Sequence, residues 1–233
     1  MTLRLHYAPD NASLCVRLAL EELGLDYRTV LVDRRIRAQR APADLALNPH
    51  GLIPVLETEE GPIFETAAIL LWLADRHRDR VALLPAPEAP NRGRALAWLF
   101  WMSNTLHPAS RIMFYGDAHV APAHVAALQE ATARRIDAML DRLEAASPEL
   151  GDWLGGHGPS ALDCYLGPML RWCALYPEGD TGWFDLGTRP RLRALLARFE
   201  ARACVAAAIA AEGLGEAPFT APRLPQPPEG SAT

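Results

Sequence analysis

The sequence predicts two domains, a small α/β domain with a mixed sheet followed by an all-α helical domain. The chain has 233 residues, enough for two modest domains of roughly 100–150 residues each. Half of the residues are apolar and 22% are charged, the usual mix for a globular protein with a buried core. Strand-like and helical patterns alternate up to about residue 80, whereas almost all later patterns are helical.

The first domain, at residues 1–80, is expected to follow the order β-α-β-α-β-β-α. Short runs bounded by turn residues predict strands at residues 3–7, 27–32, 53–57 and 62–64. Apolar residues at helical spacing predict helices at residues 14–23 and 66–77, and a helical or irregular segment ends at residue 47. Gly24 favours the end of the first helix, and residues 58–61 have the length of a hairpin loop.

Prolines divide the rest of the chain. Residues 81–90 are punctuated by prolines and are interpreted as a linker. Residues 91–215 are expected to form the all-helical domain, with helices at about 91–115, 121–146, 161–175 and 189–212. Residues 216–233 are again rich in proline and are expected to form a loosely held tail.

The charge and the residue types exclude several functions. A formal charge of −5 and a pI near 5.8 give no basic surface, so neither nucleic acid nor an anionic membrane is expected as a partner. All 23 basic residues are arginines, which excludes a Schiff-base lysine and a phosphate-binding loop with its lysine.

The four cysteines favour a cytoplasmic protein without a metal site. They show neither C-x-x-C pairs nor zinc-finger spacing with histidines, so we expect reduced thiols and no metal. The first residues lack the basic stretch and long apolar run of a signal peptide. The longest apolar run, residues 67–74, is far shorter than the roughly 20 residues of a membrane-spanning helix.

The Ile53-Pro54 bond is the first candidate feature of a binding site. It follows the turn at residues 48–51 and opens a strand, where a proline cannot donate a ladder hydrogen bond. If the bond is cis, the backbone of Ile53 can pair with a short extended peptide. The alternative is an ordinary trans proline at the start of an edge strand.

Glu65 and Thr66 precede the long helix of the first domain. A helix N-terminus with a free hydroxyl and unpaired N–H groups can bind a carboxylate, and the adjacent Glu65 can neutralise an ammonium group. Together the two residues would hold both charges of an amino-acid terminus. The alternative is that Thr66 only caps the helix.

Asn11 and Ser13 lie at the junction between the first strand and the first helix. Hydroxyl and N–H groups at such a junction can stabilise an anion, including a thiolate. A simple N-cap role for Ser13 is the alternative.

Three segments form a combined pattern. They are Asn48-Pro49-His50-Gly51-Leu52-Ile53-Pro54, Phe64-Glu65-Thr66 before a helix, and the capping box Ser160-Ala161-Leu162-Asp163. Together they resemble the glutathione S-transferase family. The run from Tyr165 to Trp172 and the pair Leu106-His107 resemble the bacterial beta-type branch of that family.

The resemblance implies a thioredoxin-like, glutathione-binding first domain and a hydrophobic substrate pocket in the helical domain. It also implies that Ile53 makes backbone contacts with glutathione beside a cis Pro54, and that Glu65 and Thr66 hold the γ-glutamyl end. His107 and Trp172 are further substrate-binding candidates. The alternatives are a histidine bonded to a carbonyl and a tryptophan of the core.

The chain departs from the beta-type pattern around the expected sulfur. Ala12 stands where beta-type members have a cysteine, and Pro108 stands where they have a lysine. Tyr7 is only a distant counterpart of the tyrosine used by other members, and Cys15 fits the apolar pattern of the first helix. Ser13 and Asn11 therefore remain as the predicted catalytic residues, with His107 as a further candidate.

The predicted function is conjugation of the glutathione thiolate to an electrophilic apolar substrate, as in detoxification. Glutathione is the expected co-substrate, a small hydrophobic electrophile is the expected partner, and the resemblance implies a homodimer. Two alternatives stay open. One is a glutathione-dependent disulfide reductase or peroxidase, which on this fold normally uses a cysteine at position 12. The other is a non-catalytic binding protein with the same fold.

Overall fold

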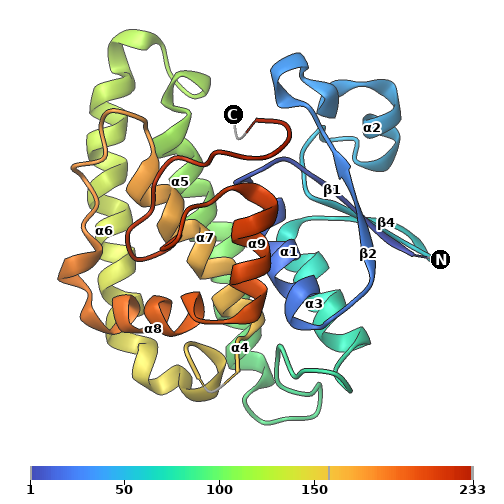
Figure 1. Cartoon of the computed structure of the whole chain (residues 1–233). Coiled ribbons are helices and arrows are strands. Elements are labelled where there is room, and N and C mark those ends of the chain that lie inside the picture. The colour runs from blue at the N-terminus through green and yellow to red at the C-terminus, as the bar shows by residue number, and fades with distance from the viewer. Residues whose placement is uncertain (1, 157, 232–233) are drawn as a thin grey trace.

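The computed structural model describes residues 2–156 and 158–231, which form an α/β domain followed by a helical domain (Figure 1). The predicted fold class is thereby confirmed. The connection between the two domains, residues 77–91, contains neither helix nor strand. The domains lie side by side, so residues of both can line one site.

A four-stranded mixed sheet organises the first domain. Its strands are β1 (Leu3–Tyr7), β2 (Tyr27–Leu31), β3 (Val55–Thr58) and β4 (Gly61–Phe64). The order is β2-β1-β3-β4, and β1 runs parallel to β2 but antiparallel to β3, which is antiparallel to β4. Leu5, at the centre of β1, pairs with Thr29 and Leu56 and is fully buried.

Three α-helices accompany the sheet. They are α1 (Ser13–Glu22), α2 (Pro42–Leu47) and α3 (Thr66–Arg76), with two short 3-10 turns at Arg34–Ile36 and Ala38–Arg40. Helices α1 and α3 lie between the sheet and the helical domain, whereas α2 lies apart at one end of the first domain (Figure 1). The N-terminal ends of α1 and α3 are therefore available to a site between the domains.

The helical domain begins with a long helix that changes its winding at its centre. Its segments are α4 (Arg92–Trp101), a π-helical stretch (Met102–Leu106) and α5 (His107–Phe114). The next two helices are α6 (Val125–Leu150) and α7 (Ala161–Leu175). Within the described part of the chain, no helix is both long and apolar enough to cross a membrane.

The segment expected as one helix at residues 189–212 is two helices, α8 (Pro190–Glu200) and α9 (Ala203–Glu212). Arg202 between them has an extended backbone, with φ −86° and ψ 150°. Helix α8 packs on α6 and α7, whereas α9 packs on α1 of the first domain (Figure 1). One straight helix cannot reach both surfaces, and this explains the break.

Helix α7 is the central element of the core. Every residue from Ala161 to Cys173 is buried. The predicted capping box is present, because the Ser160 hydroxyl accepts hydrogen bonds from the first turn and Asp163 accepts one from the Ser160 N–H at 2.9 Å. A fixed start of this helix places Tyr165 and Trp172 at defined positions.

The C-terminal segment is packed, and the expectation of a loosely held tail was wrong. Phe219 is 1% exposed and stacks on Phe199 with ring centroids 5.4 Å apart. Glu200 accepts hydrogen bonds from the N–H groups of Phe219 and Thr220, at 2.6 and 2.7 Å. The segment then returns to the first domain (Figure 1), where Glu229 accepts a hydrogen bond from the Tyr7 hydroxyl.

Candidate active site

A cavity of about 280 Å³ lies between the two domains and is lined by residues of both. Most of the residues singled out from the sequence line it. These are Asn11, Ile53, Pro54, Glu65, Thr66, His107 and Trp172. Ser13 does not line the cavity.

The loop before β3 brings Ile53 to the cavity. Asn48 is buried, and its side chain donates to the Leu52 carbonyl at 2.8 Å and accepts from the His50 N–H at 3.1 Å. Gly51 has φ +60°, a conformation that favours glycine, and a Cβ there would lie 3.0 Å from the Gln39 carbonyl oxygen. The Ile53–Pro54 bond that follows is cis, as the resemblance implies.

Glu65 and Thr66 meet the cavity at the start of α3. Glu65 precedes the helix with φ +72° and ψ 115°, a conformation that is unfavourable for a residue with a side chain and is often found at functional sites. Thr66 is the first helical residue and not the N-cap, so its hydroxyl is not used to cap the helix. The first N–H groups of the helix lack intrahelical partners and can donate hydrogen bonds to an anion.

In the turn between β1 and α1, Asn11 lines the cavity, whereas Ser13 is buried outside it. Ser13 is fully buried, and its hydroxyl donates to the Ala8 carbonyl at 3.1 Å. The side-chain oxygen Oδ1 of Asn11 accepts a hydrogen bond from the Ala12 N–H at 2.9 Å, and this bond fixes the Asn11 amide beside the cavity. Asn11 is therefore the polar side chain of this turn that can reach a ligand.

Tyr7 is also excluded from the cavity lining. It is 2% exposed, and the Arg17 guanidinium lies over its ring at 4.8 Å from the centroid. Burial and the bond to Glu229 raise the pKa of its hydroxyl well above the usual value. Tyr7 thus stays protonated and directed at the C-terminal segment.

Sequence reasoning missed a buried ionic group behind the Asn11 turn. Asp10, with φ +50°, accepts hydrogen bonds from Arg171 Nε at 2.8 Å, Arg171 Nη2 at 2.9 Å and Trp172 Nε1 at 2.8 Å. The side chains of Asp10 and Arg171 are both 0% exposed. Arg171 is the one charged residue between Cys164 and Leu175 of α7, and a charge in such an apolar run needs a partner, so a signal was present in the sequence.

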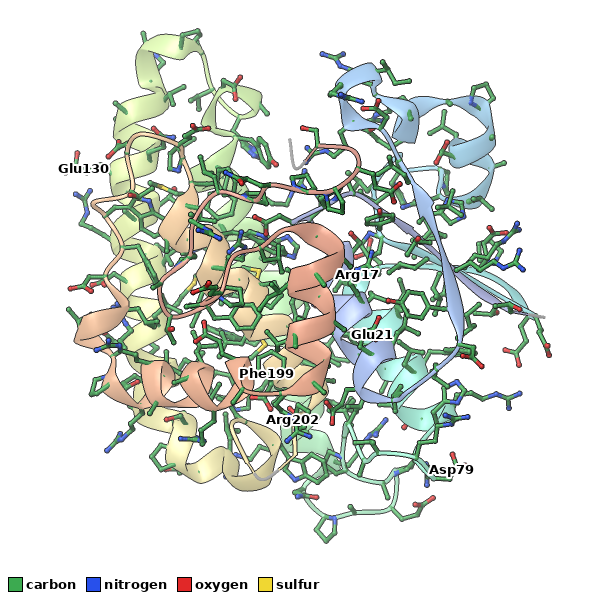
Figure 2. All side chains as sticks on the ribbon, in the orientation of Figure 1. Arg17, Glu21, Asp79, Glu130, Phe199 and Arg202 are labelled. Carbon is green, nitrogen blue, oxygen red and sulfur yellow. The ribbon has the colours of Figure 1, made fainter. Side chains whose placement is uncertain are left out.

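Glu212, at the end of α9, also binds the turn that contains Asp10 and Asn11. It accepts from the Asp10 N–H at 2.7 Å and from Arg17 Nε at 2.6 Å. Figure 2 shows Arg17 at the contact between α1 and α9. Burial raises the pKa of Glu212 to about 7, although Arg17 opposes the shift. Two helices of the second domain therefore fix the backbone of Asp10 next to Asn11.

His107 belongs to the opposite wall, at the start of α5. Its Nδ1 is 3.0 Å from the Tyr165 hydroxyl, and its ring centroid is 5.9 Å from that of Trp172. Burial and the nearby Arg111 lower the pKa of His107 to about 4, so the ring is neutral at pH 7. His107 can accept or donate one hydrogen bond there, but it brings no charge to the cavity.

The described residues hold no group of three or more His, Cys, Asp or Glu side chains placed for a metal ion. All four cysteines are free and buried. Burial raises the pKa of each of these thiols, so none is a ready nucleophile at neutral pH.

Comparisons with known proteins agree with this geometry. Two family models match, "Glutathione S-transferase, N-terminal domain" at residues 12–76 and "Glutathione S-transferase, C-terminal domain" at residues 125–198. Glutathione S-transferase GstA of Escherichia coli O157:H7 is 28% identical over 217 residues, 91% of this chain and 100% of that protein. Maleylacetoacetate isomerase of Rhizobium meliloti (strain 1021) is 41% identical over 107 residues, 46% of this chain and 49% of that protein.

Solved structures extend the similarity to the three-dimensional arrangement. A sphingomonad glutathione S-transferase complexed with glutathione has a TM-score of 0.75 and 31% sequence identity. The match covers 91% of this chain and 100% of that chain. The match therefore includes both domains.

Proposed function

Since the chain belongs to the glutathione S-transferase family, we propose that it conjugates the glutathione thiolate to an electrophilic apolar substrate. One observation carries the proposal. The N-terminus of α3, the backbone beside cis Pro54, the Asn11 amide and an aromatic wall all line one cavity.

Glutathione is proposed to lie along the wall of the first domain. Its γ-glutamyl carboxylate would accept hydrogen bonds from the first N–H groups of α3 and from the Thr66 hydroxyl. Its ammonium would lie against the Glu65 carboxylate. The backbone of Ile53 would pair with the cysteinyl unit in the manner of an added strand.

Thiol activation is assigned to Asn11 and the positive end of α1. A free thiol has a pKa near 8.5, and lowering it by two units needs about 2.7 kcal/mol of selective stabilisation of the thiolate. One hydrogen bond from an amide and the dipole of a helix N-terminus together have about this magnitude. Ser13, whose hydroxyl is bonded to Ala8, is left out of this role.

The aromatic residues of the helical domain are proposed to bind the electrophile. Phe114, Tyr115, Trp172 and Tyr176 line this wall of the cavity and offer apolar surface beside the expected position of the sulfur. A disulfide reductase mechanism is less well supported, because Ala12 cannot form a mixed disulfide with glutathione. The proposal also includes a cytoplasmic homodimer that acts in detoxification.

Calorimetric titration tests the glutathione site. Wild type should bind glutathione at least tenfold more tightly than cysteinylglycine, which lacks the γ-glutamyl unit. Glu65→Gln should weaken glutathione by about 10–100-fold, because charge-assisted hydrogen bonds contribute about 1.5–3 kcal/mol each. The variant should leave cysteinylglycine nearly unchanged.

Two further variants serve as controls. Glu60→Gln removes an exposed glutamate in the hairpin loop of the same domain and should change neither affinity. Thr66→Ser keeps the hydroxyl and should be nearly silent. Equal affinity of the wild type for both ligands would contradict the proposed site and, with it, the transferase function.

A further inference from the structure

The two walls of the cavity differ in charge. Among the described residues of the helical domain that line it, Arg111 on α5 is the one with a charge at neutral pH, since the low pKa of His107 keeps that ring neutral. The wall of the first domain carries three charged residues: Arg34, Asp10, which Arg171 neutralises, and Glu65, which the proposed function assigns to an ammonium group. Arg111 is thus a positive charge in an otherwise uncharged and largely aromatic half of the cavity.

Arg111 has no acidic partner among the described residues. Its guanidinium makes neither an ion pair nor a hydrogen bond there, and it lies over the Tyr115 ring at 5.5 Å from the centroid. Other arginines, such as Arg17, Arg171 and Arg189, are bound to carboxylates. A guanidinium that stacks on a ring keeps its N–H edge free for a planar anion.

The spacing along α5 places Arg111 on the side of this helix that faces the cavity. His107, Arg111 and Tyr115 are four residues apart in turn, so they share one face of the helix and its end. All three line the cavity. If Arg111 binds the anionic group of a ligand, an aromatic ring of that ligand would lie against Tyr115 and the other aromatic side chains of this wall.

We propose that Arg111 binds a carboxylate of the second substrate, so that the preferred electrophile is an aromatic or apolar molecule with a carboxylate group. This inference rests on the proposed transferase function and specifies its substrate class. The proposed function gives the γ-glutamyl carboxylate of glutathione a different partner, the N-terminus of α3 on the first-domain wall. A bidentate pair between guanidinium and carboxylate is the strongest anion contact that this wall offers.

The probe substrates are 4-chloro-3-nitrobenzoate and its neutral methyl ester. In both, the sulfur of the glutathione thiolate forms a bond to the ring carbon that carries chlorine. The C–Cl bond then breaks, and chloride leaves with the bonding electron pair. The thiol proton has passed to solvent beforehand. The two probes therefore undergo the same reaction and differ in the charge of one remote group.

The activity test compares kcat/KM of each variant with that of the wild type for each probe. Arg111→Gln should lower kcat/KM about three- to fivefold for the carboxylate and less than about twofold for the ester, as expected for a solvated charge pair. Arg111→Lys should lose less, because it keeps the charge and loses only the planar fork. Arg142→Gln, which removes an exposed arginine of α6 away from the cavity, should change neither probe.

A binding test gives an answer even without turnover. Calorimetry with the two glutathione conjugates of these probes should show that the wild type prefers the carboxylate conjugate and that Arg111→Gln loses this preference. An equal loss for both conjugates, or for glutathione itself, would overturn the inference by placing Arg111 at the glutathione site. So would an unchanged preference. Failure of the wild type to bind glutathione would instead overturn the proposed function on which the inference rests.

Discussion

Replacement of Arg171 by methionine should destabilise the protein more than any exposed substitution. Arg171 makes two hydrogen bonds to the Asp10 carboxylate, at 2.8 and 2.9 Å, in a pair whose side chains are 0% exposed. It also donates to the carbonyls of Leu214, Pro218 and Arg223, at 3.2, 3.1 and 2.9 Å. Methionine fills similar space but donates nothing.

The expected loss of stability follows from the buried Asp10 carboxylate, which remains without its main partner. Without Arg171, the buried Asp10 carboxylate keeps only the Trp172 Nε1 donor, and three carbonyls lose a donor. Breaking a buried ion pair by removing one partner costs about 3–5 kcal/mol. For a chain of this size, that corresponds to a fall in Tm of roughly 6–20 °C.

The loss should also depend on pH. Burial already raises the pKa of Asp10, and Arg171 and Trp172 oppose this shift. In Arg171→Met the pKa of Asp10 rises further, so the folded state binds more protons than the unfolded state between about pH 3.9 and the raised pKa. Stability falls as pH rises through that window. The variant should therefore lose less stability at pH 5 than at pH 8.

Chemical denaturation at pH 5 and pH 8 measures both effects, with Arg189→Met as the control. Arg189 is also buried, at 3% side-chain exposure, but its partners Asp137 and Asp141 are 58% and 67% exposed. Its removal leaves no buried carboxylate, so the loss should be smaller and nearly independent of pH. A loss below about 1 kcal/mol for Arg171→Met, or equal losses at both pH values, would refute the reasoning.

Two further predictions concern the thiol and the cysteines. Asn11→Ala should shift the midpoint of the pH–rate profile for conjugation up by about one pH unit, which corresponds to the loss of one hydrogen bond to the thiolate. Ser13→Ala should leave this midpoint unchanged and only lower the stability of the fold. An equal shift in both variants would show that Ser13 also acts on the sulfur. Treatment of the native protein with iodoacetamide at pH 7.5 should leave all four cysteines unmodified, as measured by mass spectrometry, because they are buried thiols with raised pKa values. Rapid labelling of Cys15 with loss of glutathione binding would contradict this prediction.

Local patterns were sufficient for most of the fold. The strands and helices of the first domain and the capping box of α7 depend on residues close in sequence, and the structure confirms them. The break between α8 and α9 and the packed C-terminal segment depend on distant contacts. Glu200, for example, holds Phe219 and Thr220. No periodicity within residues 189–233 reveals that partnership.

In the site, too, local sequence patterns predict some features, whereas others depend on contacts between residues far apart in the sequence. Seven predicted residues line one cavity. The five of the first domain belong to turns or helix ends that the sequence marks, whereas His107 and Trp172 were found through the resemblance. The role of Ser13 depended on the direction of its side chain at the start of α1, where its hydroxyl donates to the Ala8 carbonyl. The partnership of Asp10 with Arg171 joins residues 161 positions apart. A charge in an apolar helix indicates that a partner exists, but it does not say which.

The contacts of Asp10 give the helical domain a second role in the proposed reaction. Its carboxylate is held by α7 and its N–H by Glu212 of α9, while the next residue, Asn11, faces the cavity. A hydrogen bond to a thiolate is effective only if the donor is fixed before the charge develops. The helical domain therefore contributes the electrophile wall and also the support behind the thiol side. For this reason, a loosened contact between the domains should raise the pKa of the bound thiol even where every residue of the first-domain wall is intact.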